Sequence, residues 1–190
     1  MTRRDENSSA VRGGTTLLLV ALAGSLVATA LGMYARLHTP TGRPLALIMG
    51  FSGMATMKAW LATAGALLGV LQLQSVLWMW GRLPFAGAPP AWVALCHRWC
   101  GTLAFLVTLP VAYHCLWSLG FATSGTRAVL HSLFGCAFYG AFATKMLALR
   151  VRGLPGWALP LVGGVLFALL IAAWASSSLW YFSQPGLPLL

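Results

Sequence analysis

Apolar residues occur along the chain in long uninterrupted runs, separated by short polar segments rich in Gly, Pro and Arg. A transmembrane helix needs about 20 predominantly apolar residues, and only helices or closed barrels cross a bilayer. The pattern therefore predicts an all-α integral membrane bundle of five transmembrane helices. We expect these helices at residues 15–36, 56–80, 91–121, 127–149 and 157–180.

The apolar run that follows the first polar break is too long for a single span. It extends from Pro44 to about Trp80, and the sequence between Gly50 and Gly53 offers a place to divide it. We interpret residues 45–55 as a short interfacial or re-entrant piece before the second transmembrane helix. Such a piece is tolerated at membrane depth where protein or a water-filled cavity surrounds it.

The rest of the chain divides into one domain and two ends. Residues 1–14 are polar and are predicted to form a flexible cytoplasmic tail, residues 15–182 a single transmembrane domain, and residues 183–190 a short C-terminal tail. A basic start before an apolar run also resembles a signal peptide. The run is longer than the roughly 7 to 15 residues of a signal-peptide core, which favours a retained helix over a cleaved one.

Composition supports the membrane assignment. Hydrophobic residues make up 59% of the chain and charged residues 7%, whereas about 25% of a typical soluble domain is charged. The net charge of +10 comes from basic residues scattered singly between apolar runs, which argues against nucleic-acid binding and indicates topology determinants and lipid-headgroup contacts. An excess of these residues falls on one side, so we expect a multi-pass cell-membrane protein with a cytoplasmic N-terminus and an extracytoplasmic C-terminus.

Acidic residues are confined to Asp5 and Glu6, so residues 7–190 contain no carboxylate side chain. Their absence excludes paired-carboxylate hydrolysis, carboxylate-held Mg²⁺ or Ca²⁺, and proton relays through Asp or Glu. The four cysteines include no C-x-x-C pair, which weakens a thiol-oxidoreductase interpretation. A cysteine within an apolar helix is usually a small hydrophobic residue.

Two histidines lie on the third and fourth apolar runs. His114 precedes the polar turn at 122–126 by about eight residues and His131 follows it by about five. In an antiparallel helical hairpin with a rise of about 1.5 Å per residue, the two imidazoles lie within about 5 Å of each other along the membrane normal. Two axial ligands of a haem iron need this placement. The alternative is that each histidine only hydrogen-bonds a neighbouring helix.

Residues around this histidine pair suit a haem. Gly135 lies one turn after His131 and leaves room for a flat macrocycle. Arg127, Lys58 and Arg36 are candidates to pair with haem propionates. The alternative for these cations is an ordinary interfacial anchor that snorkels to the headgroups.

His97 and Lys58 each have a further candidate role with an alternative. His97 lies 17 residues before His114, a separation of roughly 25 Å that suits two haems stacked across a bilayer. No other histidine lies at that depth, so a role at the helix start is the alternative for His97. Lys58, close to Trp60, is also a candidate contact for a quinone headgroup, against an ordinary interfacial Lys/Trp pair.

Several segments carry a resemblance to known proteins. They are Lys58–Thr63, His97–Phe105, Leu109–Trp117, His131–Gly140 and Leu154–Trp157. Over about residues 45–182 the chain resembles a family of uncharacterised bacterial multi-pass membrane proteins. More loosely, the histidine-bearing hairpin is similar to membrane b-type cytochromes of the cytochrome b561 and ferric-reductase kind. That similarity implies haem b and electron transfer, although one matched histidine pair is evident where two are typical.

Two hypotheses for the function follow. The first is a membrane b-type haem protein with His114 and His131 as axial ligands, transferring electrons between the quinol pool and an extracytoplasmic redox partner. The second is a non-catalytic membrane anchor or assembly subunit of a redox complex, which packs against another membrane subunit through its small residues. A transporter is disfavoured because intramembrane carboxylates are lacking.

Overall fold

The computed structural model describes residues 3–44 and 48–186, and every regular element within these ranges is helical. Five long helices follow one another along the chain: α1 (Arg3–Leu37), α2 (Met54–Met79), α3 (Trp92–His114), α4 (Thr126–Ala148) and α5 (Ala158–Trp174). A π-helical segment, η1 (Cys115–Leu119), extends α3. A second, η2 (Ala175–Leu179), extends α5 and leads into the short α6 (Trp180–Phe182). The all-α class is confirmed.

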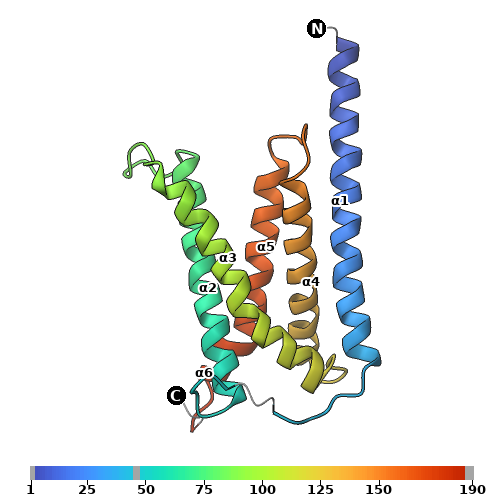
Figure 1. Cartoon of the computed structure of the whole chain (residues 1–190), viewed down its shortest axis with the longest axis vertical. Helices are drawn as coiled ribbons and strands as arrows, with labels where there is room; N and C mark the ends of the chain where they lie inside the picture. Colours follow the sequence, from blue (N-terminus) through green and yellow to red (C-terminus); the bar gives the residue numbers. More distant parts are fainter. Residues whose placement is uncertain (1–2, 45–47, 187–190) are drawn as a thin grey trace.

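The long helices run alternately up and down, so the N-terminus and the C-terminus lie at opposite ends of the bundle (Figure 1). Helices α2 and α3 form one antiparallel pair and α4 and α5 another, while α1 packs on α4. Helix α5 also packs on α2 and joins the two pairs. Helix α4 therefore lies between α1 and α5 in the middle of the bundle.

Four of the long helices are long and apolar enough to cross a membrane: Gly13–Leu37, Met54–Met79, Trp92–Leu119 and Ala158–Phe182. Large apolar side chains on them are exposed, such as Leu26 at 70% and Leu67 at 63%. These helices indicate a multi-pass membrane protein in contact with lipid.

The fifth predicted span, 127–149, is a helix of the expected length but is not among these candidates. Its polar side chains lower its hydropathy, and the bundle satisfies several of them. The Tyr139 hydroxyl donates to the Thr108 carbonyl at 2.9 Å, and the Thr144 hydroxyl donates to the Gly140 carbonyl at 3.1 Å. A helix between two others is shielded from lipid on more than one side, so it can carry more polar groups.

Two further segments had been predicted from the sequence, a flexible tail and an interfacial piece. Helix α1 begins at Arg3 and includes most of the stretch predicted to be a flexible tail. Residues 48–53 of the predicted interfacial piece form turns in which Met49 and Gly50 have positive φ, while 45–47 lie outside the described residues. Helix α3 contains Pro110 and continues to His114, after which its hydrogen bonding changes to the π pattern at Cys115.

Small residues bring α1 and α4 into backbone contact. A Cβ atom added to Gly140 would lie 2.6 Å from the Gly24 carbonyl oxygen and 2.8 Å from the Ala28 Cβ. A Cβ added to Gly24 would in turn lie 2.5 Å from the Gly140 carbonyl oxygen. Only glycine permits this approach, which is the usual means by which helices pack closely in a membrane.

The register of α2 against α3 is set by two similar contacts. A Cβ on Gly65 would lie 3.2 Å from the Thr108 methyl group, and one on Gly101 would lie 3.0 Å from the Gln72 side-chain oxygen. The Gln72 amide also donates to the His97 carbonyl. Continued by about two turns toward the other end, this register places Lys58 roughly level with Cys115.

Candidate functional site

A cavity of 430 Å³ lies at the end of the bundle where α3 and α5 change into η1 and η2. Its volume falls within the roughly 300 to 1,000 Å³ of ligand pockets. The walls are mainly apolar and come from α1, α2, α3, α4 and the C-terminal segment. Four lining residues carry the polar chemistry used below: Lys58, Arg127, His131 and Ser178.

The C-terminal wall of the cavity is fixed to α2 by side-chain hydrogen bonds. The Trp174 indole N–H donates to the Thr63 hydroxyl at 2.9 Å, and the hydroxyls of Tyr181 and Thr56 are hydrogen-bonded at 2.9 Å. Tyr181 and Thr56 are both buried. These bonds hold the C-terminal segment against α2 and so fix the side of the cavity that this segment forms.

His131 has a defined hydrogen-bonding pattern on α4. Its Nδ1 lies 3.1 Å from the Ala173 carbonyl oxygen and 3.3 Å from the Ser176 hydroxyl oxygen. Because a carbonyl oxygen only accepts hydrogen bonds, Nδ1 carries the proton and donates it. The Nε2 atom then keeps its lone pair, and the residue lines the cavity. A metal-binding histidine usually donates its other ring N–H to a carbonyl in this way.

Arg127 is held at the mouth of the same cavity. It donates from Nη1 to the Ser176 carbonyl at 2.7 Å, and its guanidinium lies 3.7 Å from the centroid of the Trp180 ring. A π-helical segment such as η2 changes the helical hydrogen-bond register, which leaves carbonyl groups available to outside donors. Both Arg127 and His131 donate to carbonyls in this region, so η2 positions the two residues that α4 presents to the cavity.

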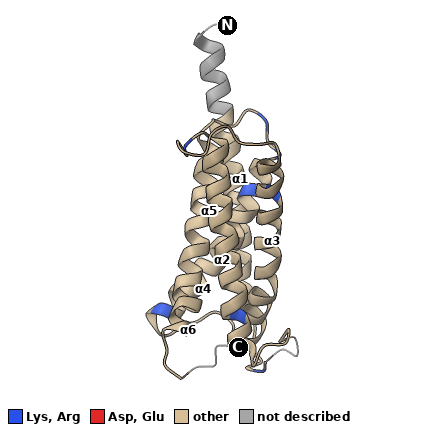
Figure 2. Cartoon of the chain, turned by 90° about the vertical axis from the view of Figure 1, so that its left-hand side faces the viewer, with Lys and Arg blue, Asp and Glu red and all other residues tan. Residues whose placement is uncertain are grey.

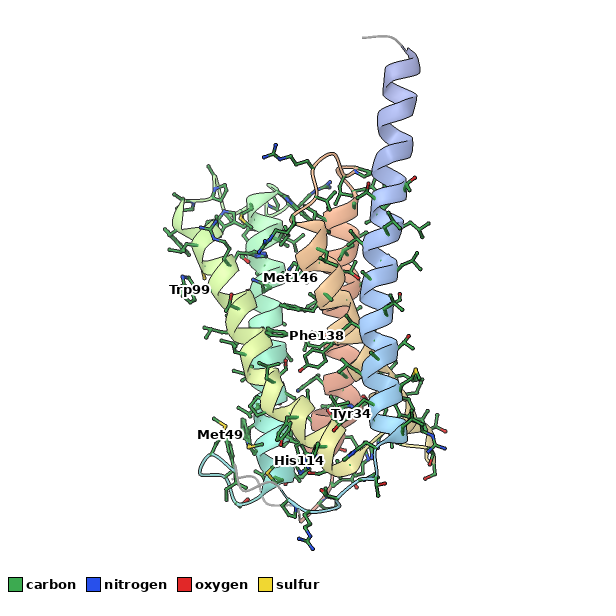
Figure 3. The ribbon with its side chains drawn as sticks, turned by 45° about the vertical axis from the view of Figure 1, so that its right-hand side comes forward. Tyr34, Met49, Trp99, His114, Phe138 and Met146 are labelled. Atoms are coloured by element: carbon green, nitrogen blue, oxygen red, sulfur yellow. The ribbon has the colours of Figure 1, made fainter. Side chains whose placement is uncertain are left out.

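The structure brings His131, Arg127 and Lys58 to one cavity, but it places His114 beside that cavity. His114 is buried, with 5% of its surface exposed, and the neighbouring Cys115 lines the wall instead. Figure 3 shows His114 at the end of α3. Its Nδ1 has no hydrogen-bond partner among the described residues. The pairing of His114 with His131 on one iron stays a prediction.

The space beside Gly135 is open. A Cβ atom added there would meet nothing within 4 Å, and Gly135 lines the cavity. Gly140, five residues later on the same helix, instead touches the backbone of α1. The two glycines of α4 therefore serve different purposes, one for the cavity and one for helix packing.

The other two histidines lie away from the cavity lining. His97 belongs to the opposite end of the bundle, where its Nδ1 lies 2.8 Å from the Ser75 hydroxyl within the α2–α3 interface. His38, in the loop after α1, lies with Nε2 3.2 Å from the Trp117 carbonyl oxygen. Its ring stacks on Tyr34 at a centroid distance of 5.2 Å. These contacts give both histidines a structural role.

Sequence reasoning missed the serines of η2. Ser176 contacts His131, and Ser178 lines the cavity with only 1% of its surface exposed. The run of three serines at 176–178 inside an apolar helix was the available signal. Hydroxyl groups in a membrane helix either bond back to their own helix or face a polar site.

The side chains present fit a haem better than a bare metal ion. Among residues 13–44 and 48–186, no group of three or more His, Cys, Asp or Glu could hold a metal ion. A haem supplies four ring nitrogens of its own and needs only one or two axial ligands from the protein. One histidine with a free Nε2, an apolar cavity and nearby cations meet that requirement.

Comparisons with known proteins bear on the family alone. No curated protein and no solved structure matches the chain. A family of unknown function, DUF6529, matches residues 17–189, and the chain belongs to that family.

Proposed function

We propose that this protein is a membrane b-type haem protein that transfers electrons between the quinol pool and an extracytoplasmic redox partner. The observation that carries the proposal is the bonding of His131, whose Nδ1 is 3.1 Å from the Ala173 carbonyl oxygen while the residue lines the cavity. This pattern fixes the ring and leaves Nε2 free to serve as an axial ligand. When bound, haem b supplies an iron that is reversibly oxidised and reduced by one electron.

His114 is the proposed second axial ligand. It is buried at the same end of the bundle, and it carries an Nδ1 without a partner among the described residues. A buried polar atom without a hydrogen bond is unfavourable, and a bound group would relieve that cost. His114 would gain a partner for its buried Nδ1 if it held the group together with His131.

The remaining residues bind and shield the group. Gly135 leaves room for a flat ring against α4. Tyr139 and Trp174 line the cavity and are held by hydrogen bonds to Thr108 and Thr63. Their aromatic rings exclude water and keep the site apolar.

We also propose that α4 crosses the membrane, which makes five spans. It packs antiparallel between α1 and α5 and extends alongside them (Figure 1). Basic residues lie at both ends of the bundle (Figure 2), with more of them at the end opposite the cavity. By the positive-inside rule that end is cytoplasmic, so the cavity opens toward the outer side of the cell membrane.

The test is a reduced-minus-oxidised absorption spectrum of the full chain purified from haem-replete cells. We expect a b-type signal that His131→Ala abolishes and His114→Ala abolishes or converts to a different spin state. His38→Ala is the matched control, since His38 lies at the same end but outside the cavity lining. A colourless protein that copurifies with another membrane subunit would instead support the anchor or assembly role.

A further inference from the structure

We propose that Arg127, Lys58 and Ser178 form a receptor for the acidic group of an amphiphilic ligand in the cavity, either a carboxylate or a phosphate. All three residues line the same cavity. The inference shares that cavity with the proposed function and rests on it for the macrocycle, but it does not depend on iron. It requires the ligand to carry an acidic group, which binding through His131 alone would not require.

Arg127 has the geometry of a prepared anion receptor. The Trp180 ring at 3.7 Å and the Ser176 carbonyl at 2.7 Å fix its guanidinium. A guanidinium has five N–H donors in a planar fork, and the bond to Ser176 uses one of them. A fork whose orientation is fixed in advance loses little side-chain freedom when it binds a carboxylate or phosphate.

The protein supplies no acidic partner for the two cations. Residues 7–190 contain no carboxylate side chain, so neither Arg127 nor Lys58 can form an ion pair with one there. Lys58 is partly buried and lines the cavity. Charged groups inside a membrane protein usually face a partner of opposite charge or a water-filled cavity. Arg127 is exposed at the mouth of the cavity and Lys58 is partly buried in its wall, so an acidic group that enters there can contact both cations.

Ser178 provides an independent observation. Its side chain is 1% exposed, its hydroxyl has no partner within the part of the chain that the structure describes, and it lines this cavity. A hydroxyl both donates and accepts hydrogen bonds. Leaving one buried and unpaired is unfavourable, so the cavity is incomplete without a polar group from a ligand.

The ligand combines an apolar body with an acidic end. Apolar walls surround most of the cavity, while Lys58 and Arg127 lie near the starts of α2 and α4, at one end of the bundle. A porphyrin with propionates and an anionic phospholipid share this chemistry, and each reaches the site from the bilayer. The two sources are separated below by the choice of probe.

The first arm of the test uses iron-free protoporphyrin IX and its dimethyl ester, titrated by fluorescence into the full chain in phosphatidylcholine nanodiscs. Arg127→Gln and Lys58→Gln should each weaken binding of the free acid about tenfold, since each tenfold change corresponds to about 1.4 kcal/mol and a charged hydrogen bond contributes about that much or more. Binding of the dimethyl ester should not change. His38→Ala, which lies outside the cavity lining, should affect neither probe. Neither probe contains iron, so this test is separate from the iron spectrum.

The second arm replaces phosphatidylcholine by phosphatidylglycerol and measures the melting temperature. A rise that Arg127→Gln or Lys58→Gln removes identifies the acidic group as a lipid phosphate and also supports the receptor. Arg36→Gln is the control, because Arg36 is exposed at the same end and does not line the cavity. Ser178→Ala provides a neutral variant should either charge change prevent folding. Wild-type responses of all three variants to both the free acid and phosphatidylglycerol would overturn the proposal.

Discussion

The contact between α1 and α4 predicts that two glycines of one helix respond oppositely to the same substitution. In Gly140→Ala the new Cβ would lie 2.6 Å from the Gly24 carbonyl oxygen and 2.8 Å from the Ala28 Cβ. Neither of these atoms can rotate away, so the two helices must separate. In Gly135→Ala the new Cβ meets nothing within 4 Å.

Two opposing effects determine how each substitution changes the free energy of unfolding. Replacing Gly by Ala in a helix interior stabilises it by up to about 1 kcal/mol. Forcing an extra methyl group into a packed contact costs about 1–3 kcal/mol. Because the propensity gain is common to both variants, the difference between them isolates the packing cost. Gly135→Ala should therefore be more stable than Gly140→Ala by about 1–3 kcal/mol.

The assay is reversible denaturant unfolding of each variant in the same mixed micelles, followed by circular dichroism, so that only the substitution differs. Gly24→Ala is the reciprocal change and should destabilise in the same sense, since its Cβ would lie 2.5 Å from the Gly140 carbonyl oxygen. Equal free energies of unfolding for Gly135→Ala and Gly140→Ala would refute the close α1–α4 approach.

Three further substitutions test the cavity and its walls. Gly135→Leu should keep the wild-type melting temperature yet prevent porphyrin binding, because its side chain fills the cavity; undiminished binding would contradict the placement of the ligand. Thr63→Val leaves the Trp174 indole N–H without its 2.9 Å acceptor and should cost about 1–3 kcal/mol in unfolding experiments, whereas Thr102→Val, which loses only a bond to its own helix, should cost less. Gly120→Ala should destabilise by about 1–3 kcal/mol because φ is +70° there and few other residues adopt that backbone conformation; an unchanged melting temperature would argue against this turn.

The lengths of the apolar runs identified the long helices of this bundle, but not how polar each helix is or how the segments between them fold. The apolar runs predicted every long helix, because a membrane helix must be apolar over its whole length. Helix α4 was expected to resemble the others, yet its sequence is more polar because it lies between α1 and α5. Residues 48–53, part of the predicted interfacial or re-entrant piece, form turns at the end of the bundle.

The sequence predicted the positions of the histidines along the bundle better than the directions in which their side chains point. Counting residues from the turn placed His114 and His131 at the same end of the bundle, and it placed Arg127 one turn before His131 on the same helix. The count does not determine which way a side chain points, since this depends on how each helix is rotated. His131 lines the cavity and His114 does not. The π-helical segments add to the difference, because they change helix rotation at the level of the site and have no distinctive sequence pattern.

The contacts of His38 show a second limit of sequence reasoning. A histidine in a polar loop looks solvated, but this one stacks on Tyr34 and lies beside the Trp117 carbonyl. The loop after α1 crosses the end of η1, where the Gly42 N–H donates to the Ser118 carbonyl at 3.0 Å. Contacts between segments so distant in sequence depend on the fold and could not be inferred from local pattern.

The haem content of the full chain, purified without added porphyrin from haem-replete cells, shows whether His131 binds a haem iron. We expect close to stoichiometric haem b in the wild-type protein and almost none in His131→Ala, with both proteins equally helical and monodisperse. Equal haem content in the two proteins, or none in either, would contradict the assignment of His131 as the ligand at the centre of this site.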